Sequence, residues 1–537
     1  MIRLTELSLP IDHPDEALRP AILKRLGLKD TQLAGFTVFK RSYDARKKSV
    51  DLCFVYTVDL DVADEASVLA RFADDRNVNV APDIGYHFVT HTAPAMAHRP
   101  VIVGFGPCGI FAALVLAQMG FRPIVLERGT AVRERTKDTW ALWRKNILNP
   151  ESNVQFGEGG AGTFSDGKLY SQIKDPRYLG RKVLHEFVKA GAPEEILYVS
   201  KPHVGTFRLA SMVEKMRADI IALGGEIRFQ QRVTDVLIED SHIRGVTLAS
   251  GEQIRSDHVV IALGHSARDT FRMLHARGVF MEAKPFSMGF RIEHPQSLID
   301  RARLGKFAGH PKLGAADYKL VHHARNGRSV YSFCMCPGGT VVAATSEENR
   351  VVTNGMSQYS RNERNANAGI VVGITPEADY PGGPLAGLAL QEHWESRAFV
   401  LGGGTYEAPA QLVGDFIAGR ASTQLGAVVP SYKPGVKLGS LDTALPAYAI
   451  DAIREALPAF EKQIRGFALH DAVLTGVETR TSAPMRITRG DDLQSLNTRG
   501  LYPAGEGAGY AGGILSAGVD GIRIAEALAK QMIADAA

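Results

Sequence analysis

The chain has 537 residues, with 62 Lys and Arg against 58 Asp and Glu, which gives a formal net charge of only +4. This near balance of charge does not indicate a protein that binds nucleic acids without specificity. A hydrophobic content of 45% excludes a disordered chain, and the length predicts about three or four domains, each with an ample core.

Residues 1–95 alternate between strand-like and helix-like patterns. Strand patterns occur at 2–9, 35–43, 50–62 and 85–91, and amphipathic helical patterns occur at 16–28 and 66–73. The order βαββαβ predicts a small ferredoxin-like domain. A segment with prolines, residues 93–100, follows as a linker.

The hairpin between the second and third predicted strands is basic. Within nine residues it carries Lys40, Arg41, Arg46, Lys47 and Lys48. Such a cluster can contact RNA phosphates or a partner protein. It can equally be the solvated end of a hairpin, because few aromatic residues are interleaved with the charges, and both interpretations stay open.

Residues 99–129 read as a βαβ unit with a glycine-rich turn, an arrangement typical of dinucleotide binding. Gly104 permits the tight turn, Gly106 lets the backbone approach a pyrophosphate, and Gly109 allows the helix to pack closely on the strand. Glu127 follows Gly104 by 23 residues, where a carboxylate can accept hydrogen bonds from both ribose hydroxyls and repel a 2′-phosphate. The unit therefore favours a dinucleotide other than NADP.

Residues 156–167 form a second glycine-rich segment with no regular pattern. It contains Gly157, Gly159, Gly160 and Gly162. Its backbone N–H groups are suited to wrapping a flavin or its phosphates, and the alternative is a mobile surface loop.

Two later segments predict further contacts with the dinucleotide. The strand at 259–263 ends in a turn at Gly264, after two strands that read as a β-meander. Residues 500–528 contain a short strand, the triplet Gly505-Glu506-Gly507, and Gly512-Gly513 at the start of a helix. The alternative for this C-terminal segment is a structural turn that leads into a packing helix.

The C-terminal segment resembles the two-dinucleotide-binding-domain flavoproteins, whose Gly-Asp-Gly motif is Gly-Glu-Gly here. The resemblance implies that Glu506 contacts the ribityl or pyrophosphate part of FAD. Its side chain is one methylene longer than that of the Asp in the usual motif. It also implies that the following helix points its N-terminus at the N1/C2 carbonyl edge of the flavin, where negative charge gathers on reduction.

A narrower resemblance extends over almost the whole chain. Residues 153–171, 333–348 and 476–484 look like a bacterial family described as uncharacterised FAD-dependent dehydrogenases or NAD(FAD)-utilising dehydrogenases. It implies an FAD site and a three-part layout, and we expect the FAD to be bound non-covalently. We expect a βαββαβ domain at 1–95, a Rossmann-like three-layer ββα FAD-binding domain at 96–274 and 466–537, and an inserted α+β substrate domain at 275–465.

These arguments together define an expected cofactor site, and no Cys or His group has the spacing of a metal site. The residues expected to bind FAD are Gly104, Gly106, Pro107, Cys108, Gly109, Glu127, Arg128, Gly157, Gly159, Gly160, Gly162, Val233, Gly264, Gly505, Glu506, Gly507, Gly512, Gly513 and Ile514.

Candidate catalytic residues are His265, Cys336, Glu478 and Arg480, each of which can also be purely structural. Cys334 and Cys336 as a redox disulfide would mirror the flavin disulfide reductases. In an extended strand, however, residues i and i+2 lie about 7 Å apart, beyond the usual range for a disulfide bridge. Such a pair would need a tight local turn. Arg291 can clamp an anionic substrate or form an ion pair.

The expected function is that of an FAD-dependent oxidoreductase that transfers a hydride between flavin N5 and an unidentified small-molecule substrate. A second dinucleotide-binding unit is missing from the sequence, so either NAD(P)H binds transiently as the electron donor or another reductant takes this role. Alternatives are a flavin-dependent RNA-modifying enzyme that uses the basic hairpin, and a non-enzymatic FAD-binding redox sensor.

The compartment follows from cysteine content and the N-terminal segment. Four cysteines are too few to stabilise a chain of this length by disulfides, which predicts a reducing compartment. The N-terminus has acids and prolines where a signal peptide needs an apolar run, and the sequence has no apolar run of 18 residues. We therefore expect a cytoplasmic protein with no membrane contact.

Overall fold

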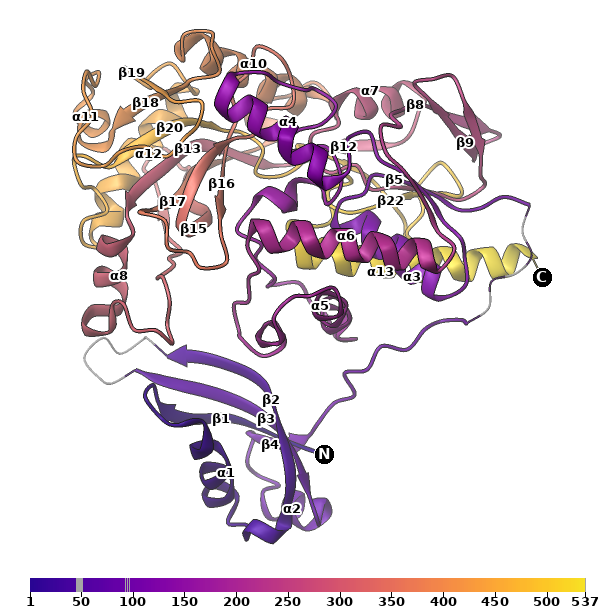
Figure 1. Cartoon of the computed structure of the whole chain (residues 1–537). Coiled ribbons are helices and arrows are strands. Elements are labelled where there is room, and N and C mark those ends of the chain that lie inside the picture. Colours follow the sequence, from indigo (N-terminus) through magenta and orange to yellow (C-terminus); the bar gives the residue numbers. More distant parts are fainter. Residues whose placement is uncertain (45–51, 92, 94, 96, 537) are drawn as a thin grey trace.

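The N-terminal part of the chain folds into a four-stranded antiparallel sheet with the order β2-β3-β1-β4 (Figure 1). The computed structural model describes residues 1–44, 52–91, 93, 95 and 97–536. The elements are β1 (Ile2–Pro10), α1 (Leu18–Leu26), β2 (Leu33–Asp44), β3 (Cys53–Val62), α2 (Glu65–Arg71) and β4 (Val78–Val80). The βαββαβ order with this strand arrangement is ferredoxin-like, as the sequence predicts.

The fourth strand of this sheet is not where the sequence predicts it. β4 lies at 78–80 because Val78 is buried and pairs with Leu4 of β1. The predicted strand at 85–91 is not a strand. Tyr86 and Phe88 instead pack against the core of the next domain, where the ammonium group of Lys182 lies over both rings. Tertiary packing thus overrides the strand propensity of this segment.

The second unit is built on a five-stranded parallel sheet with the order β22-β11-β5-β6-β7. Its strands are β5 (Val101–Val103), β6 (Ile124–Leu126), β7 (Glu226–Arg228), β11 (Val259–Ile261) and β22 (Leu501–Pro503). β5, β6, β11 and β22 are buried along their whole length, which is typical of a parallel sheet covered on both faces.

Alternate residues of the central strands point to two different layers. Ile102 packs with the helical layer, whereas Val101 and Val103 pack with the antiparallel meander. The helices are α3 (Pro107–Gln118), α5 (Leu179–Lys189), α6 (Thr206–Ala222) and α13 (Ile514–Ala536), and the meander is β8 (Val233–Glu239), β9 (His242–Leu248) and β10 (Gln253–Arg255). The result is the predicted three-layer, Rossmann-like unit, assembled from segments on both sides of the insertion (Figure 1).

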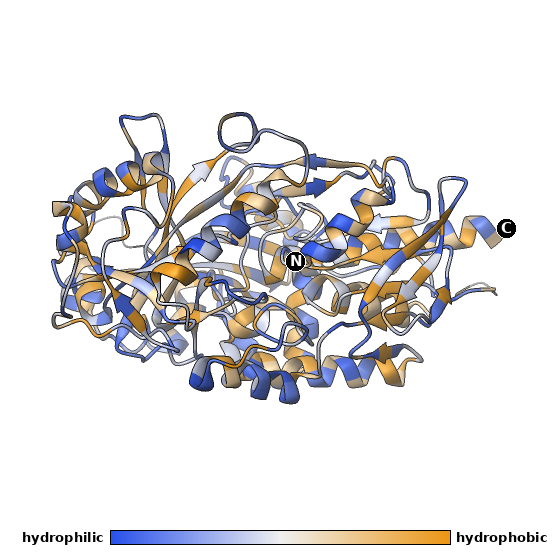
Figure 2. Cartoon of the chain, turned by 90° about the horizontal axis from the view of Figure 1, so that it is seen from above, coloured by the Kyte–Doolittle hydropathy of each residue, from blue (hydrophilic) through white to orange (hydrophobic). Residues whose placement is uncertain are grey.

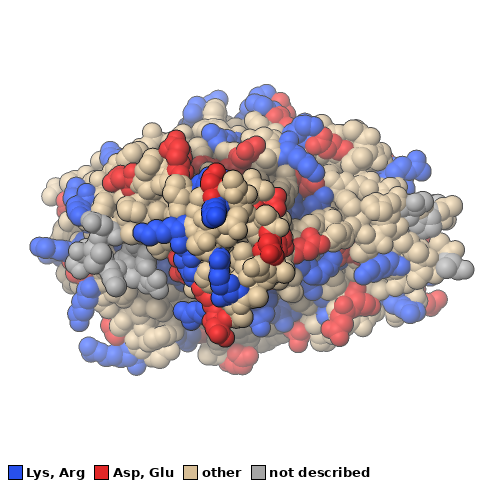
Figure 3. Space-filling model, turned by 90° about the horizontal axis from the view of Figure 1, so that it is seen from below, with Lys and Arg blue, Asp and Glu red and all other residues tan. Residues whose placement is uncertain are grey.

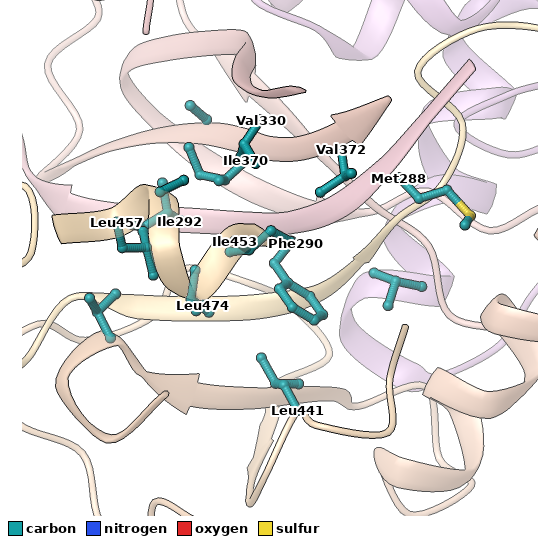
Figure 4. Close-up of a cluster of buried hydrophobic side chains, with 14 of the residues drawn as sticks. Met288, Phe290, Ile292, Val330, Ile370, Val372, Leu441, Ile453, Leu457 and Leu474 are labelled. Atoms are coloured by element: carbon teal, nitrogen blue, oxygen red, sulfur yellow. The ribbon is translucent and has the colours of Figure 1, made fainter. Parts of the chain in front are cut away.

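The insertion is organised around an eight-stranded sheet with the path β14-β15-β17-β13-β20-β18-β19, in which β16 also pairs with β15. Its strands are β13 (Phe286–Pro295), β14 (Val321–His323), β15 (Ser329–Ala343), β16 (Thr353–Ser357), β17 (Asn365–Ile374), β18 (Ala408–Leu412), β19 (Val436–Leu438) and β20 (Val473–Glu478). Figure 4 shows side chains of β13, β15, β17 and β20 gathered with Ile453 and Leu457 of α12 (Ala447–Glu461). This cluster is the core of the insertion.

β20 lies on the C-terminal side of the boundary expected at residue 465, although it belongs to the sheet of the insertion. Its pairing with β13 and β18 draws Val473–Glu478 into that sheet. The chain enters and leaves the insertion side by side, because β12 (Met281–Ala283) pairs with β21 (Met485–Ile487).

The remaining helices surround these sheets. They are α4 (Val132–Lys145), α7 (Arg268–Ala276), α8 (Gln296–Leu304), α9 (Pro376–Asp379), α10 (Ala386–Leu401) and α11 (Val413–Ala418). Figure 2 shows hydrophobic residues concentrated along the strands and inner helix faces, with hydrophilic stretches on the outer helices. Within the described residues, none of the helices combines the length and the apolar character needed to cross a membrane.

Candidate functional site

A cavity of about 370 Å³ lies between the parallel sheet and the inserted sheet. The insertion contributes Phe333, Cys334, Asn354 and Glu478 to its wall. The sequence-predicted residues in the wall are Gly104, Gly106, Pro107, Cys108, Glu127, Arg128, Gly160, Gly162, Val233, Gly264, His265, Glu478, Arg480, Gly505, Glu506, Gly512, Gly513 and Ile514. Gly109, Gly157, Gly159, Cys336 and Gly507 lie behind this wall. The fold therefore brings most of the predicted residues to one site.

The glycines of the β5–α3 turn have different physical roles. A Cβ on Gly104 would lie 2.3 Å from the carbonyl oxygen of Ala262, and one on Gly109 would lie 2.0 Å from the carbonyl oxygen of Gly104. The packing of the chain itself therefore requires both glycines. A Cβ on Gly106 would meet Gly160 Cα only at an ordinary contact of 3.6 Å. Gly106 is the N-cap residue of α3 and gives the helix no side-chain cap, so N–H groups of the first turn are available to a phosphate.

The Glu127 carboxylate is already a structural acceptor. It accepts hydrogen bonds from the backbone N–H groups of Phe105, Gly129 and Gly157, each at 2.9 Å. A carboxylate offers about four acceptor positions. The structure thus leaves room for about one ribose hydroxyl, where the sequence predicted two.

Arg128 is held in place beside this carboxylate by other partners. It pairs with Glu151 at 2.9 Å and with Asp269 at 2.9 Å, and its guanidinium lies 4.2 Å from the centre of the Phe156 ring. Arg128 therefore lines the cavity in a fixed orientation.

The glycine-rich segment at 156–167 is largely buried, which does not fit the alternative of a mobile surface loop. The fully buried guanidinium of Arg135 donates to the carbonyl oxygens of Asn153 at 2.8 Å, Val154 at 2.8 Å and Glu158 at 2.6 Å. A Cβ on Gly157 would lie 2.4 Å from Arg135 Cδ. Arg135 orders the loop, and its place in an ordinary amphipathic helix gave no sign of this role in the sequence.

The C-terminal glycines also divide into two groups. A Cβ on Gly505 would lie 2.9 Å from Cys108 Cβ, and one on Gly507 would lie 2.2 Å from the carbonyl oxygen of Gly264. Internal packing thus requires these two residues. A Cβ on Gly512 would meet nothing within 4 Å, and Gly513 has a φ of +130° just before α13. The backbone at the start of α13 is therefore open to the cavity.

Arg480 has a structural set of partners rather than those expected of a catalytic group. Its guanidinium donates to Glu395 at 2.9 Å, to Ser346 at 2.7 Å and to Ser266 at 3.1 Å. Arg268 pairs with the same Glu395 carboxylate at 2.7 Å. This buried network joins the Rossmann-like unit to the insertion.

His265 lies next to this network. Burial, with Arg480 and Arg268 adding to it, lowers the pKa of His265 to about 3. One imidazole nitrogen, Nδ1, lies 2.9 Å from the Ser266 hydroxyl. The ring is therefore neutral at physiological pH. It can donate or accept a hydrogen bond, but it presents no positive charge to a substrate.

Two carboxyl groups of the cavity wall titrate near neutrality. Burial raises the pKa of Glu506 to about 8, against a smaller opposing effect of Lys284. Burial also raises the pKa of Glu478 to about 7, although Arg291 donates to this carboxylate at 2.9 and 3.0 Å. Arg291 is fully buried and forms an ion pair rather than an anion clamp open to solvent.

Lys168 is a cavity residue that the sequence analysis did not single out. Its ammonium group donates to the backbone carbonyl of Met335 in β15. Lys168 directly follows the glycine-rich segment, and this position in the sequence could have identified it as a residue of the site. Lys168 places a cation between the glycine-rich loop and the inserted sheet.

The basic hairpin is only partly described. Arg46, Lys47 and Lys48 lie outside the described residues. The Arg41 guanidinium lies 5.1 Å from the centre of the Phe54 ring and 5.2 Å from that of Tyr198. Figure 3 shows basic and acidic side chains mixed on the face seen from below. The described part of the hairpin thus has intramolecular partners.

Family models match two parts of the chain. The model described as the C-terminal domain-like region of FAD-dependent proteins matches residues 285–481. A model of a domain of unknown function matches residues 1–61. The first match spans the inserted sheet from β13 to β20.

Solved structures are similar at low identity. CtdE in complex with FAD is 12% identical, with 82% of this chain and 88% of that chain covered and a TM-score of 0.31. Glycine oxidase from Bacillus cereus is 12% identical, with 82% and 95% covered and a TM-score of 0.29. A geranylgeranyl bacteriochlorophyll reductase-like protein from Thermoplasma acidophilum is 12% identical, with 83% and 80% covered and a TM-score of 0.35.

Among curated proteins, an uncharacterised protein of Clostridium beijerinckii is 47% identical over 526 residues, which cover 98% of each chain. Identity at this level over the full length shows common membership of a family. The family model that matches residues 285–481 confirms the predicted FAD cofactor. The chain belongs to the same family as the clostridial protein.

Proposed function

We propose that the protein is an FAD-dependent oxidoreductase in which a hydride passes between FAD and a small-molecule substrate. The observation that carries the proposal is one cavity whose wall contains both residues 104–108 of the glycine-rich turn and residues of the inserted sheet. Because one cavity reaches both, a cofactor held by the turn and a substrate held by the insertion would lie in contact.

The residues present fit an extended dinucleotide. The uncapped start of α3 at Gly106 offers N–H groups to the diphosphate, and Glu127 keeps about one acceptor position for the adenosine ribose. Gly512 and Gly513 leave the start of α13 open for the flavin end. When bound, FAD supplies two-electron redox chemistry, and the chain supplies orientation and charge.

The carboxyl group of Glu506 is our candidate proton donor. With a pKa of about 8 it holds its proton at neutral pH, and it lines the cavity beside the glycines that precede α13. Glu478, whose pKa is about 7, lies in the same wall and can take up a proton in turn. A general acid with a pKa near the working pH is the most effective kind.

The first test is spectroscopic. The purified protein should be yellow and should release its flavin on acid denaturation, because we expect the cofactor to be non-covalent. Anaerobic addition of NADH or NADPH, followed by mixing with candidate acceptors, should bleach and restore the visible absorbance. A protein that stays colourless when offered FAD would refute the proposal.

A variant pair tests the assignment of the proton donor. Glu506→Gln should lower turnover and remove the pH dependence that titrates near 8. The control Glu282→Gln changes an exposed carboxyl group of β12 and should leave turnover unchanged. If no donor or acceptor supports turnover but reduction changes the shape of the protein, it is a redox sensor rather than an enzyme.

A further inference from the structure

We propose that Cys334 and Cys336 are a redox-active pair that converts reversibly between a dithiol and a disulfide at the edge of the cavity. This inference uses the cavity of the proposed function and deepens it, because it identifies thiols and disulfides as compounds that react there. It does not depend on the cofactor.

The backbone at the pair is not that of a regular strand. In the pairing of β15 with β17, Phe333 lies opposite Gly369 and Cys336 lies opposite Asn367, so two residues on β15 face one on β17. Cys334 has a φ of +44°, in the left-handed region that non-glycine residues rarely adopt. This bulge is the local irregularity that the sequence argument required before a bridge could form.

The side chain of Cys336 turns back toward Cys334 at this bulge. The Cys336 thiol donates to the carbonyl oxygen of Cys334 with a sulfur–oxygen distance of 3.4 Å, so it folds back toward the other cysteine. Both sulfurs are free in this structure, which therefore represents the dithiol form.

The two sulfurs differ in their access to a reactant. Cys334 is partly exposed and lines the cavity, whereas Cys336 is fully buried behind it. One accessible thiol with a second thiol behind it is the arrangement of an attacking and a resolving cysteine.

Two cations converge on the pair. The ammonium group of Lys168 donates to the carbonyl oxygen of Met335, the residue between the two cysteines. Arg291 donates to the carbonyl oxygen of Cys334 at 2.6 Å and to Cys336 Sγ at 3.5 Å. Contact with the Cys336 thiol lowers the pKa of Cys334, with Lys168 and Arg291 acting in the same direction. Cationic surroundings of this kind favour the thiolate that attacks a disulfide.

The reaction with an external disulfide balances as follows. The Cys334 thiolate attacks one sulfur of that disulfide, the external S–S bond breaks, and one thiolate leaves and takes up a proton. Cys336 then loses its proton and attacks the Cys334 sulfur, which forms the internal S–S bond and releases the second thiol. The external disulfide gains two electrons and two protons, and the cysteine pair loses them.

The test uses the full-length protein in buffers of glutathione and glutathione disulfide, followed by alkylation of free thiols and mass spectrometry. We expect Cys334 and Cys336 to lose alkylation together, at one midpoint, with a mass loss of two hydrogen atoms in their shared peptide. Cys334→Ser and Cys336→Ser should each abolish this loss. The control Cys53→Ser, in the N-terminal sheet, should leave it unchanged.

Two results would overturn the inference. One is full alkylation of both cysteines in the most oxidising buffer, and the other is stable glutathione adducts on Cys334 with Cys336 still alkylated. A colourless protein that still forms the internal disulfide would refute the proposed function and leave this inference standing. A yellow, catalytically active protein without the disulfide would do the reverse.

Discussion

The buried network of Arg268, Glu395 and Arg480 leads to a strong prediction about stability. Glu395 is fully buried on α10 and accepts hydrogen bonds from Arg268 at 2.7 and 2.9 Å. Arg480 donates to the same carboxylate at 2.9 and 3.0 Å, and the Thr479 hydroxyl donates at 2.8 Å. One carboxylate therefore compensates two guanidinium groups at the junction of the Rossmann-like unit and the insertion.

Glu395→Gln removes this compensating charge without changing the size of the side chain. Breaking a buried ion pair by removal of one partner costs about 3–5 kcal/mol. Glu347, whose side chain is 29% exposed, still pairs with both arginines, so we expect about 3 kcal/mol. At about 2–4 °C per kcal/mol for a large domain, the melting temperature should fall by about 10 °C.

The assay is thermal unfolding of the cofactor-free protein, with Glu392→Gln as the matched control. Glu392 lies one turn earlier on α10, where its side chain is 18% exposed and pairs with Arg350 and with Arg272, whose side chain is 46% exposed. Because ion pairs in contact with solvent contribute about 0–1 kcal/mol, the control should lose far less stability than Glu395→Gln. Equal effects of the two substitutions would refute the reasoning.

The loss of stability caused by Glu395→Gln should depend on pH. The two arginines hold the pKa of Glu395 well below its usual range, against the opposing effect of burial. The stabilisation is therefore complete above the unfolded value of about 4.3 and is lost as the pH falls toward the folded value. The difference between wild type and Glu395→Gln should shrink below pH ~4. A constant difference down to low pH would contradict the assignment.

Three further predictions follow from the cavity wall. Gly109→Ala should prevent folding, because the new Cβ would lie 2.0 Å from a backbone oxygen. Gly512→Ala should fold normally and change only flavin retention, because its Cβ would meet nothing within 4 Å. The soluble yield and the flavin absorbance of the two variants check this prediction. Glu127→Ala should lower both flavin retention and stability, because it leaves three buried N–H groups without their acceptor, and each unpaired group costs about 1–3 kcal/mol. Unchanged urea unfolding would contradict this prediction. In the cofactor-free protein, the raised pKa of Glu506 should make the free energy of unfolding fall as the pH rises from about 4.5 to 8, because the unfolded state loses this proton first. In urea unfolding, Glu506→Gln should flatten this dependence on pH. An unchanged pH dependence in the variant would refute the role of Glu506.

Features set by short stretches of chain could be predicted from the sequence. The βαβ unit follows from a run of apolar residues, a glycine-rich turn and a helix with fixed spacing, and all three depend on local backbone geometry. The meander of β8 to β10 and the ferredoxin-like order were predictable for the same reason. The strand expected at 85–91 failed because Tyr86 and Phe88 pack on another domain.

The roles of individual polar residues were less accessible from the sequence. Glu127 follows the expected spacing, yet its partners Phe105, Gly129 and Gly157 come from three different turns. Arg135 looks like any charged residue of an amphipathic helix, and its burial depends on a loop that begins about twenty residues later.

The sequence by itself determined that the chain folds as an α/β protein with a βαβ unit and a glycine-rich turn at Gly104–Gly109, because glycine spacing and strand–helix alternation act over a few residues. Only the tertiary structure decided that Arg480 is a buried ion-pair partner, that β20 belongs to the insertion, and that the Cys336 thiol turns back toward Cys334. These features depend on burial and on contacts between distant segments. The interaction energies arise only when segments far apart in the sequence pack together, so no local sequence pattern predicts them.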